Sequence, residues 1–74
     1  MILVRYAVVI EKAGSNLSAY VPDLPGCVAT GATVEETRSQ IREAIAFHLE
    51  GMREDGIAIR PPTSRVAYVD INHP

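Results

Sequence analysis

The sequence predicts a two-layer α+β domain in which one long helix packs on one face of a mainly antiparallel sheet. Segments rich in β-branched and aromatic residues occupy most of the first 31 residues and return at residues 65–71, and one amphipathic helical pattern separates them. A single helix covers one face of a single sheet, which gives the order β-β-β-α-β. Since the chain has 74 residues, it forms one domain, residues 1–74.

The N-terminal part of the chain predicts three strands. Residues 2–11, ILVRYAVVIE, are apolar on both faces, which indicates a central strand or one that a partner covers. The turn KAGSN follows, and residues 17–21, LSAYV, alternate as the second strand of a hairpin would. Residues 27–31, CVATG, form the third strand.

The helix has clear signals at both ends. Thr33 is the predicted N-cap, and Glu36 three residues later completes a capping box. Gly56 is the predicted C′ residue of a Schellman ending, in which Ile57 folds back on the last turn. Between these ends, apolar or weakly polar residues recur at helical spacing, namely Val34, Ile41, Ile45, His48, Leu49 and Met52.

A final strand is predicted after the helix. Pro61 and Pro62 prevent any further helix. Residues 65–71, RVAYVDI, then alternate, with Ala67, Val69 and Ile71 on one face and Val66, Tyr68 and Asp70 on the other.

The loop VPDLPGCVATG predicts tight turns between strands. Pro22 removes a ladder donor and ends the second strand. Asp23 is expected to bond its own backbone two residues on, as an Asx-turn. Pro25 and Gly26 stand where a type II turn needs them, and Gly31 frees the chain before the helix cap. These tasks are geometric rather than chemical.

Composition narrows the class of protein. A formal net charge of −2 argues against direct binding of nucleic acid, which usually needs a basic patch. The single cysteine, Cys27, excludes an internal disulfide and suits a reducing compartment. We expect a cytoplasmic protein, because no signal peptide or membrane span is evident. So short a chain has a small core, which favours a homodimer or homotetramer.

Enzymatic sites find little support, so we expect no catalytic residue, cofactor or metal. The helix carboxylates fall mainly on a solvated face. Glu11 and Asp70 alone make a weak metal or acid–base site. Cys27 and His48 are a conceivable nucleophile–base pair, but no third group orients them.

A protein interface is better supported than a catalytic site. Phe47 points away from the apolar stripe, beside Ala44 and Gly51. Gly51 inside a helix costs about 1 kcal/mol relative to alanine, which suggests close approach by another chain. Asp23 and Leu24, in the loop, are further candidates for contact with a partner or with a second copy.

The segments YAVVIEK, YVPDLPGCVATG and EAIAFHLEGMREDG, taken together, resemble the HicB family of bacterial toxin–antitoxin systems. The resemblance covers about residues 4–71. It implies a partial ribonuclease H-like fold, with the last strand beside the first, and a dimer or higher oligomer.

The resemblance also implies a non-enzymatic function, in which the protein binds a small RNA-cleaving HicA toxin and masks its surface. Many HicB antitoxins carry a C-terminal DNA-binding segment, whereas this sequence stops at DINHP, so we do not expect direct transcriptional autoregulation. A stand-alone HicB-like domain with a regulatory or small-ligand role is the alternative. A minimal metal-dependent nuclease is the least favoured function.

Overall fold

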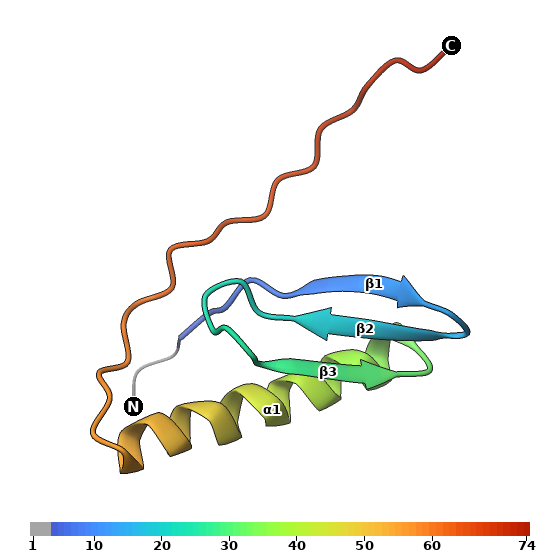
Figure 1. Ribbon diagram of the computed structural model, residues 1–74. Helices are drawn as coiled ribbons and strands as arrows, with labels where there is room; N and C mark the ends of the chain where they lie inside the picture. Colours follow the sequence, from blue (N-terminus) through green and yellow to red (C-terminus); the bar gives the residue numbers. More distant parts are fainter. Residues whose placement is uncertain (1–3) are drawn as a thin grey trace.

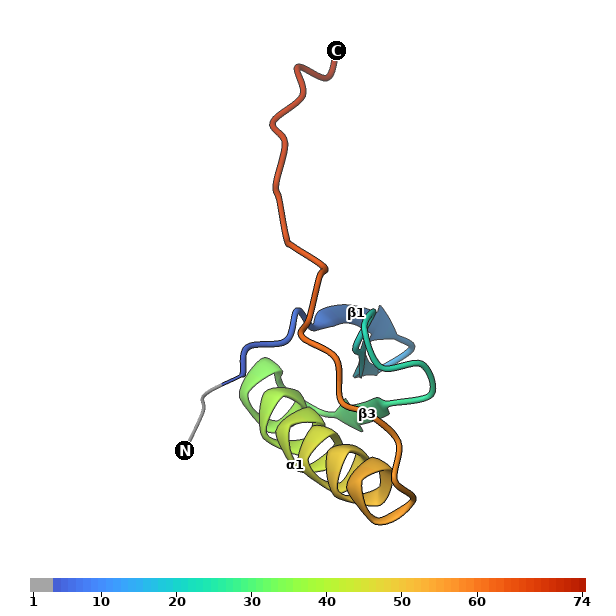
Figure 2. The same ribbon diagram turned by 90° about the vertical axis from the view of Figure 1, so that its left-hand side faces the viewer.

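The computed structural model describes residues 4–74, which form a three-stranded antiparallel sheet and one helix (Figure 1). The strands are β1 (Val9–Ala13), β2 (Asn16–Tyr20) and β3 (Val28–Gly31), and the helix is α1 (Val34–Glu54). The helix packs against β2 and β3 on one side of the sheet (Figure 2). The predicted two-layer α+β class and the β-β-β-α order of its first four elements are confirmed.

The sheet has the order β1-β2-β3, so β1 and β3 are its edges. Val9 pairs with Tyr20 at the end of the β1–β2 ladder. The first strand is therefore shorter than predicted, because Pro22 turns the chain away just after β2 and leaves residues 4–8 without a neighbour to pair with. Residues 2 and 3 of the predicted strand lie outside the described residues.

Both predicted ends of α1 are confirmed. The hydroxyl oxygen of Thr33 accepts a hydrogen bond of 3.1 Å from the Glu36 N–H, as an N-cap does. At the other end, the Ile57 N–H donates to the Met52 carbonyl at 2.8 Å, and the Gly56 N–H donates to the Arg53 carbonyl at 3.2 Å. These two bonds define a Schellman motif, and the φ of 69° at Gly56 is the left-handed value it requires.

The predicted type II turn joins β2 to β3. The Cys27 N–H donates to the Leu24 carbonyl at 3.0 Å, and Gly26 has a φ of 84°. A further bond of 3.3 Å from the Val21 N–H to the Cys27 carbonyl closes the loop at its base. The PDLPG corner is therefore a compact structural turn.

The core lies between the sheet and the helix. Its buried apolar residues are Ala19, Val21, Leu24, Cys27 and Ile41, and partly buried residues surround them. The predicted helix stripe supplies Ile41, Ile45, Leu49 and Met52. Val34 is exposed, and Thr37 takes the buried position near the helix start, where its hydroxyl donates to the Thr33 carbonyl at 2.7 Å.

Gly31 lies against the first turn of α1. A Cβ atom at this position would stand 2.7 Å from the backbone nitrogen of Thr37 and 2.9 Å from its Cα atom, closer than real Cβ contacts. Its φ is not positive. Gly31 is therefore required for close approach of strand and helix, rather than for the chain freedom that the sequence suggested.

The predicted fourth strand does not join the sheet. After α1 the chain pairs with no strand within residues 4–74, and its last part leaves both layers, as Figures 1 and 2 show. We call residues 65–74 the C-terminal arm; within it Tyr68 is 94% exposed. The resemblance implies that the last strand lies beside the first. This chain's own arm does not take that position, because it leads away from the sheet (Figures 1 and 2) and a strand forms only beside a neighbour.

Candidate protein-binding surface

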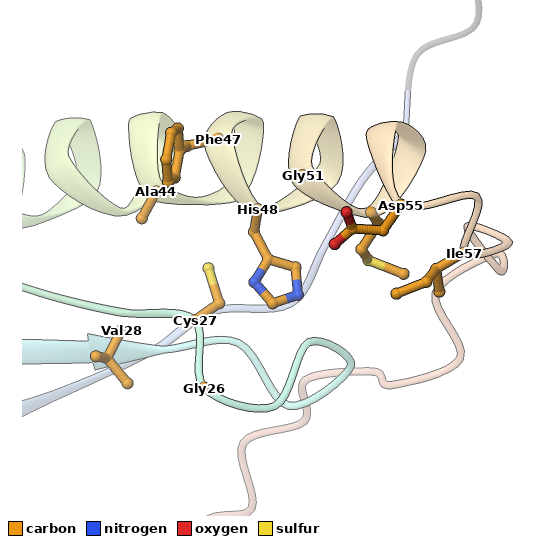
Figure 3. A pocket seen from close by; sticks show the side chains of 10 residues that line it. Gly26, Cys27, Val28, Ala44, Phe47, His48, Gly51, Asp55 and Ile57 are labelled. Atoms are coloured by element: carbon orange, nitrogen blue, oxygen red, sulfur yellow. The ribbon is translucent and has the colours of Figure 1, made fainter.

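An open groove runs between α1 and the PDLPG corner (Figure 3). Ala44, His48 and Gly51 line it from the helix, and Cys27 and Val28 line it from the start of β3. Phe47 also lines this groove, and it lines a second one whose other members include Glu36, Gln40 and Glu43. The two grooves share Val28, Ala44 and Phe47, which therefore form a ridge between them.

The ridge is strongly apolar and open to solvent. Phe47 is 81% exposed and Val28 is 65% exposed. Exposed apolar side chains that gather in one place mark sites of contact with other proteins. We call Val28, Ala44, Phe47 and Gly51 the Phe47 surface. The structure thus brings together three of the five contact residues that the sequence suggested, and adds Val28.

Gly51 leaves open space on this surface. A Cβ atom at Gly51 would have no neighbour within 4 Å among the described residues outside its own helical backbone. Packing inside the domain therefore does not require glycine at this helical position. A partner that lies close to the helix at this point would explain it.

Leu24 and Asp23 are placed elsewhere. Leu24 is 5% exposed and belongs to the core, so its side chain is not offered to a partner. Asp23 forms no Asx-turn bond in the described chain, because the residue two positions on is Pro25, which has no N–H to donate. One of its carboxylate oxygens accepts from the Thr63 N–H at 3.2 Å and the Thr63 hydroxyl at 3.1 Å, and the other accepts from the Ser64 N–H at 3.1 Å. Asp23 therefore anchors Thr63 and Ser64, the base from which the C-terminal arm extends.

The anchor changes the acidity of Asp23. Partial desolvation acts to raise its pKa, but the hydrogen bonds from Thr63 and Ser64 outweigh this effect, and the pKa of Asp23 lies below its ordinary value. Because the folded-state pKa is depressed, the anchor is fully present above the ordinary aspartate value of about 3.9. It is lost as the pH falls through the lower, folded-state pKa.

This anchor can be followed by an acid titration. We expect the amide proton shifts of Thr63 and Ser64, measured by NMR, to titrate with a midpoint below that of an unperturbed aspartate. In Asp23→Asn, which keeps the shape of the side chain but not its charge, this titration should disappear. A midpoint at the ordinary aspartate value would contradict the anchor.

Cys27 and His48 face one another across the groove (Figure 3). Burial raises the pKa of the Cys27 thiol, so the protonated form is favoured, which is the opposite of what a nucleophile needs. Both side chains form part of the wall of the groove.

The structure also bears on metal binding and on membrane spanning. In the described part of the chain, residues 4–74, no group of three or more His, Cys, Asp and Glu side chains is placed to hold a metal ion. Within the same residues, no helix has both the length and the apolar character that crossing a membrane requires.

Sequence reasoning missed two of these features. Val28 follows the buried Cys27, and strand alternation alone places it on the opposite face. The role of Thr63 and Ser64 had no comparable signal, because they lie 40 and 41 residues from Asp23 in the sequence.

Comparison with known proteins places the chain in a family. The model of the HicB-like antitoxins of bacterial toxin–antitoxin systems matches residues 6–73. A UPF0150 protein of Helicobacter pylori is 38% identical over 64 residues, which cover 85% of this chain and 89% of that protein. A 14.9 kDa protein from the rep–hol intergenic region of Haemophilus phage HP1 is 41% identical over 69 residues. Those residues are 93% of this chain but half of the phage protein's length.

A solved structure agrees with the sequence relatives. A chain in the HicA3 and HicB3 toxin–antitoxin complex superposes with a TM-score of 0.69 and 30% sequence identity. The match covers 80% of this chain and 70% of that one. The family match over residues 6–73 and the structural likeness agree with each other and with the observed order of strands and helix. This chain therefore belongs to the HicB-like antitoxin family.

Proposed function

We propose that this chain binds a HicA-type toxin and neutralises it by covering the surface that the toxin needs for its RNA substrate. The observation that carries the proposal is the match to the HicB-like antitoxin family over residues 6–73. The structural likeness to a chain from a HicA3–HicB3 complex adds the kind of partner. In this function the domain acts by binding, and no side chain of it takes part in a reaction.

The Phe47 surface suits such a partner in both shape and charge. Its apolar ridge offers an aromatic anchor, the type of residue that dominates binding energy at interfaces. Acidic side chains border the ridge, with Glu36 and Glu43 in one groove and Asp55 in the other. A protein that cleaves RNA must attract phosphates with basic side chains. An acidic rim complements such a surface and speeds the encounter of the two proteins.

Occlusion follows from this arrangement. Phe47 and Val28 would bury against the toxin while Glu36 and Glu43 occupy basic side chains that otherwise contact phosphate. The RNA would then be excluded by bulk and by charge together, without any chemical change in the toxin.

The test is co-expression with a HicA-type toxin, which we expect to be a short basic chain encoded beside this one. We expect the two chains to co-purify, and we expect this chain to restore growth of cells that express the toxin. Phe47→Glu should lose at least tenfold in affinity, because it removes the anchor and places a carboxylate in an apolar contact. Isothermal titration and the growth assay measure the loss.

Ala46→Glu is the matched control. Ala46 is an exposed residue of the same helix and lines neither groove, and the substitution adds the same charge. It should leave binding unchanged. Toxin binding by the native chain together with full binding by Phe47→Glu would reject this surface but keep the function. Absence of any toxin binding by the native chain would reject the function and favour a stand-alone regulatory domain.

A further inference from the structure

The C-terminal arm has the composition of a strand but lies in solvent. Four large apolar residues of residues 66–71 are exposed, namely Val66, Tyr68, Val69 and Ile71. Solvated tails are typically rich in charged and polar residues. Alternating β-branched and aromatic residues instead predict a strand that is covered on one face. The arm therefore lacks a neighbour that its sequence is suited to.

The outer edge of β1 also lacks a neighbour. The sheet order leaves β1 unpaired on one side, and residues 4–8 lead into it without a ladder partner among the described residues. Adjacent charged side chains, which protect an edge against pairing, stand at its far end, at Glu11 and Lys12. Within residues 4–10, which we call the β1 edge, Arg5 is the single charged residue.

The side chain of Tyr6 is further evidence that the β1 edge lacks a partner. Its hydroxyl is buried, and no described residue forms a hydrogen bond with it. Buried polar groups without partners are rare in folded proteins. An added strand would bring backbone donors and acceptors to this part of the sheet.

The base of the arm lies beside the β1 edge of its own chain but then turns away. Ser64, Arg65 and Val66 line one cavity together with residues 5–8. The three bonds to Asp23 fix Thr63 and Ser64 at this point. Beyond it, Figures 1 and 2 both show the arm leaving its own sheet. To pair within the chain, the arm would have to turn back directly after its anchor.

We propose that two copies of this chain exchange arms, so that residues 66–71 of each chain add as a fourth strand to the β1 edge of the other. Exchange of identical elements is an inexpensive way to form a dimer, and two-fold symmetry satisfies both arms and both edges. The apolar face of the arm, with Val69 and Ile71, would lie on the helix side and extend the partly buried row of Tyr6 and Val8. Tyr68 and Asp70 would face outward.

The exchange accounts for two further properties. The β1 edge is largely apolar on both faces, and the exchange would cover it with a paired strand. The short chain has a small core, and the exchange would enlarge that core with side chains from a second copy. The exchange does not depend on the toxin, because the Phe47 surface uses other residues. We therefore expect Phe47→Glu to remain a dimer.

Cross-linking distinguishes exchange from pairing within one chain. One sample carries Ala7→Cys and the other carries Tyr68→Cys; these positions are central in the β1 edge and in the arm, so they lie close whichever direction the arm runs. Cys27 is buried, so we expect little reaction there, and the native chain treated alone is the control for it. After mixing and treatment with a short bismaleimide, we expect a covalent species of twice the chain mass of 8.0 kDa. A double variant carries both Ala7→Cys and Tyr68→Cys in one chain. The proposal would be overturned if the double variant gave only single-chain products, or if the mixture of single variants gave no cross-link at all.

A pair of point variants tests the predicted face of the arm. Val69→Asp places a charge on the covered face and should convert the dimer to a monomer in sedimentation equilibrium. The helical part of its far-ultraviolet circular dichroism should be unchanged, because α1 lies outside the arm and Val69 is exposed within its own chain; only the strand contribution of the arm should be lost. Tyr68→Asp places the same charge on the outward face and should stay dimeric. A dimeric Val69→Asp, or a native chain that sediments as a monomer, would contradict the exchange.

Discussion

Gly31→Ala is expected to lower the free energy of unfolding by about 1–3 kcal/mol, the usual cost of forcing an extra carbon into a filled site. The new Cβ atom would stand 2.7 Å from the Thr37 backbone nitrogen, inside the first turn of α1. A backbone atom cannot rotate away as a flexible side chain can, so the helix start and β3 must move apart. Denaturation by urea, followed through the helical circular dichroism signal, measures this loss.

Gly51→Ala is the matched control, since it makes the same substitution at a glycine where the new carbon meets nothing within 4 Å among the described residues outside its own helical backbone. Within a helix it should raise stability by about 1 kcal/mol, because alanine is the better helix former. The two substitutions should therefore have opposite signs. A neutral Gly31→Ala would show that α1 and β3 are not in such close contact.

Sequence reasoning succeeded where the signals are local. The ends of α1 depend on Thr33, whose hydroxyl accepts from the Glu36 N–H, and on Gly56, whose left-handed φ allows the Schellman bonds. The type II turn likewise depends on Pro25 and Gly26, which are adjacent. Such features need no knowledge of the rest of the chain, and the structure has them where the sequence placed them.

Reasoning failed where a feature depends on residues far apart. Residues 65–71 have the pattern of a strand, but a pattern does not say which edge they pair with, or in which chain. Asp23 illustrates both kinds of failure. Pro25 has no N–H to close the expected turn, which is a local fact, whereas no local signal shows that Thr63 and Ser64 donate to its oxygens. Periodicity predicts which face a residue lies on; it does not identify the partner across the space between elements.

In the candidate surface, too, the residue on a regular element was predicted correctly and the residue in an irregular loop was not. The helical wheel correctly separated Phe47 from the apolar stripe, because α1 is regular. Leu24 was offered as a contact residue because it lies in an irregular loop, where no period separates inside from outside. The loop folds it into the core, next to Ile41 of the helix.

Ile41→Ala is expected to have the largest effect on stability, with a loss of about 2–5 kcal/mol. Ile41 is 2% exposed and is the only helix residue among the buried apolar residues of the described chain, so its removal leaves a cavity against Ala19, Val21 and Leu24. Since small domains are stable by only about 5–15 kcal/mol, this loss should lower the thermal midpoint by many degrees. Calorimetry of the purified variant measures the change.

Phe47→Ala provides the comparison that separates folding from binding. It removes a larger side chain than Ile41→Ala does, but from a position that is 81% exposed, so stability should change by no more than about 0.5 kcal/mol. The same variant should weaken toxin binding, because its aromatic anchor is gone. If Phe47→Ala instead destabilised the isolated chain as much as Ile41→Ala, Phe47 would be part of the core or of the self-association interface, and the Phe47 surface would have to be reassigned.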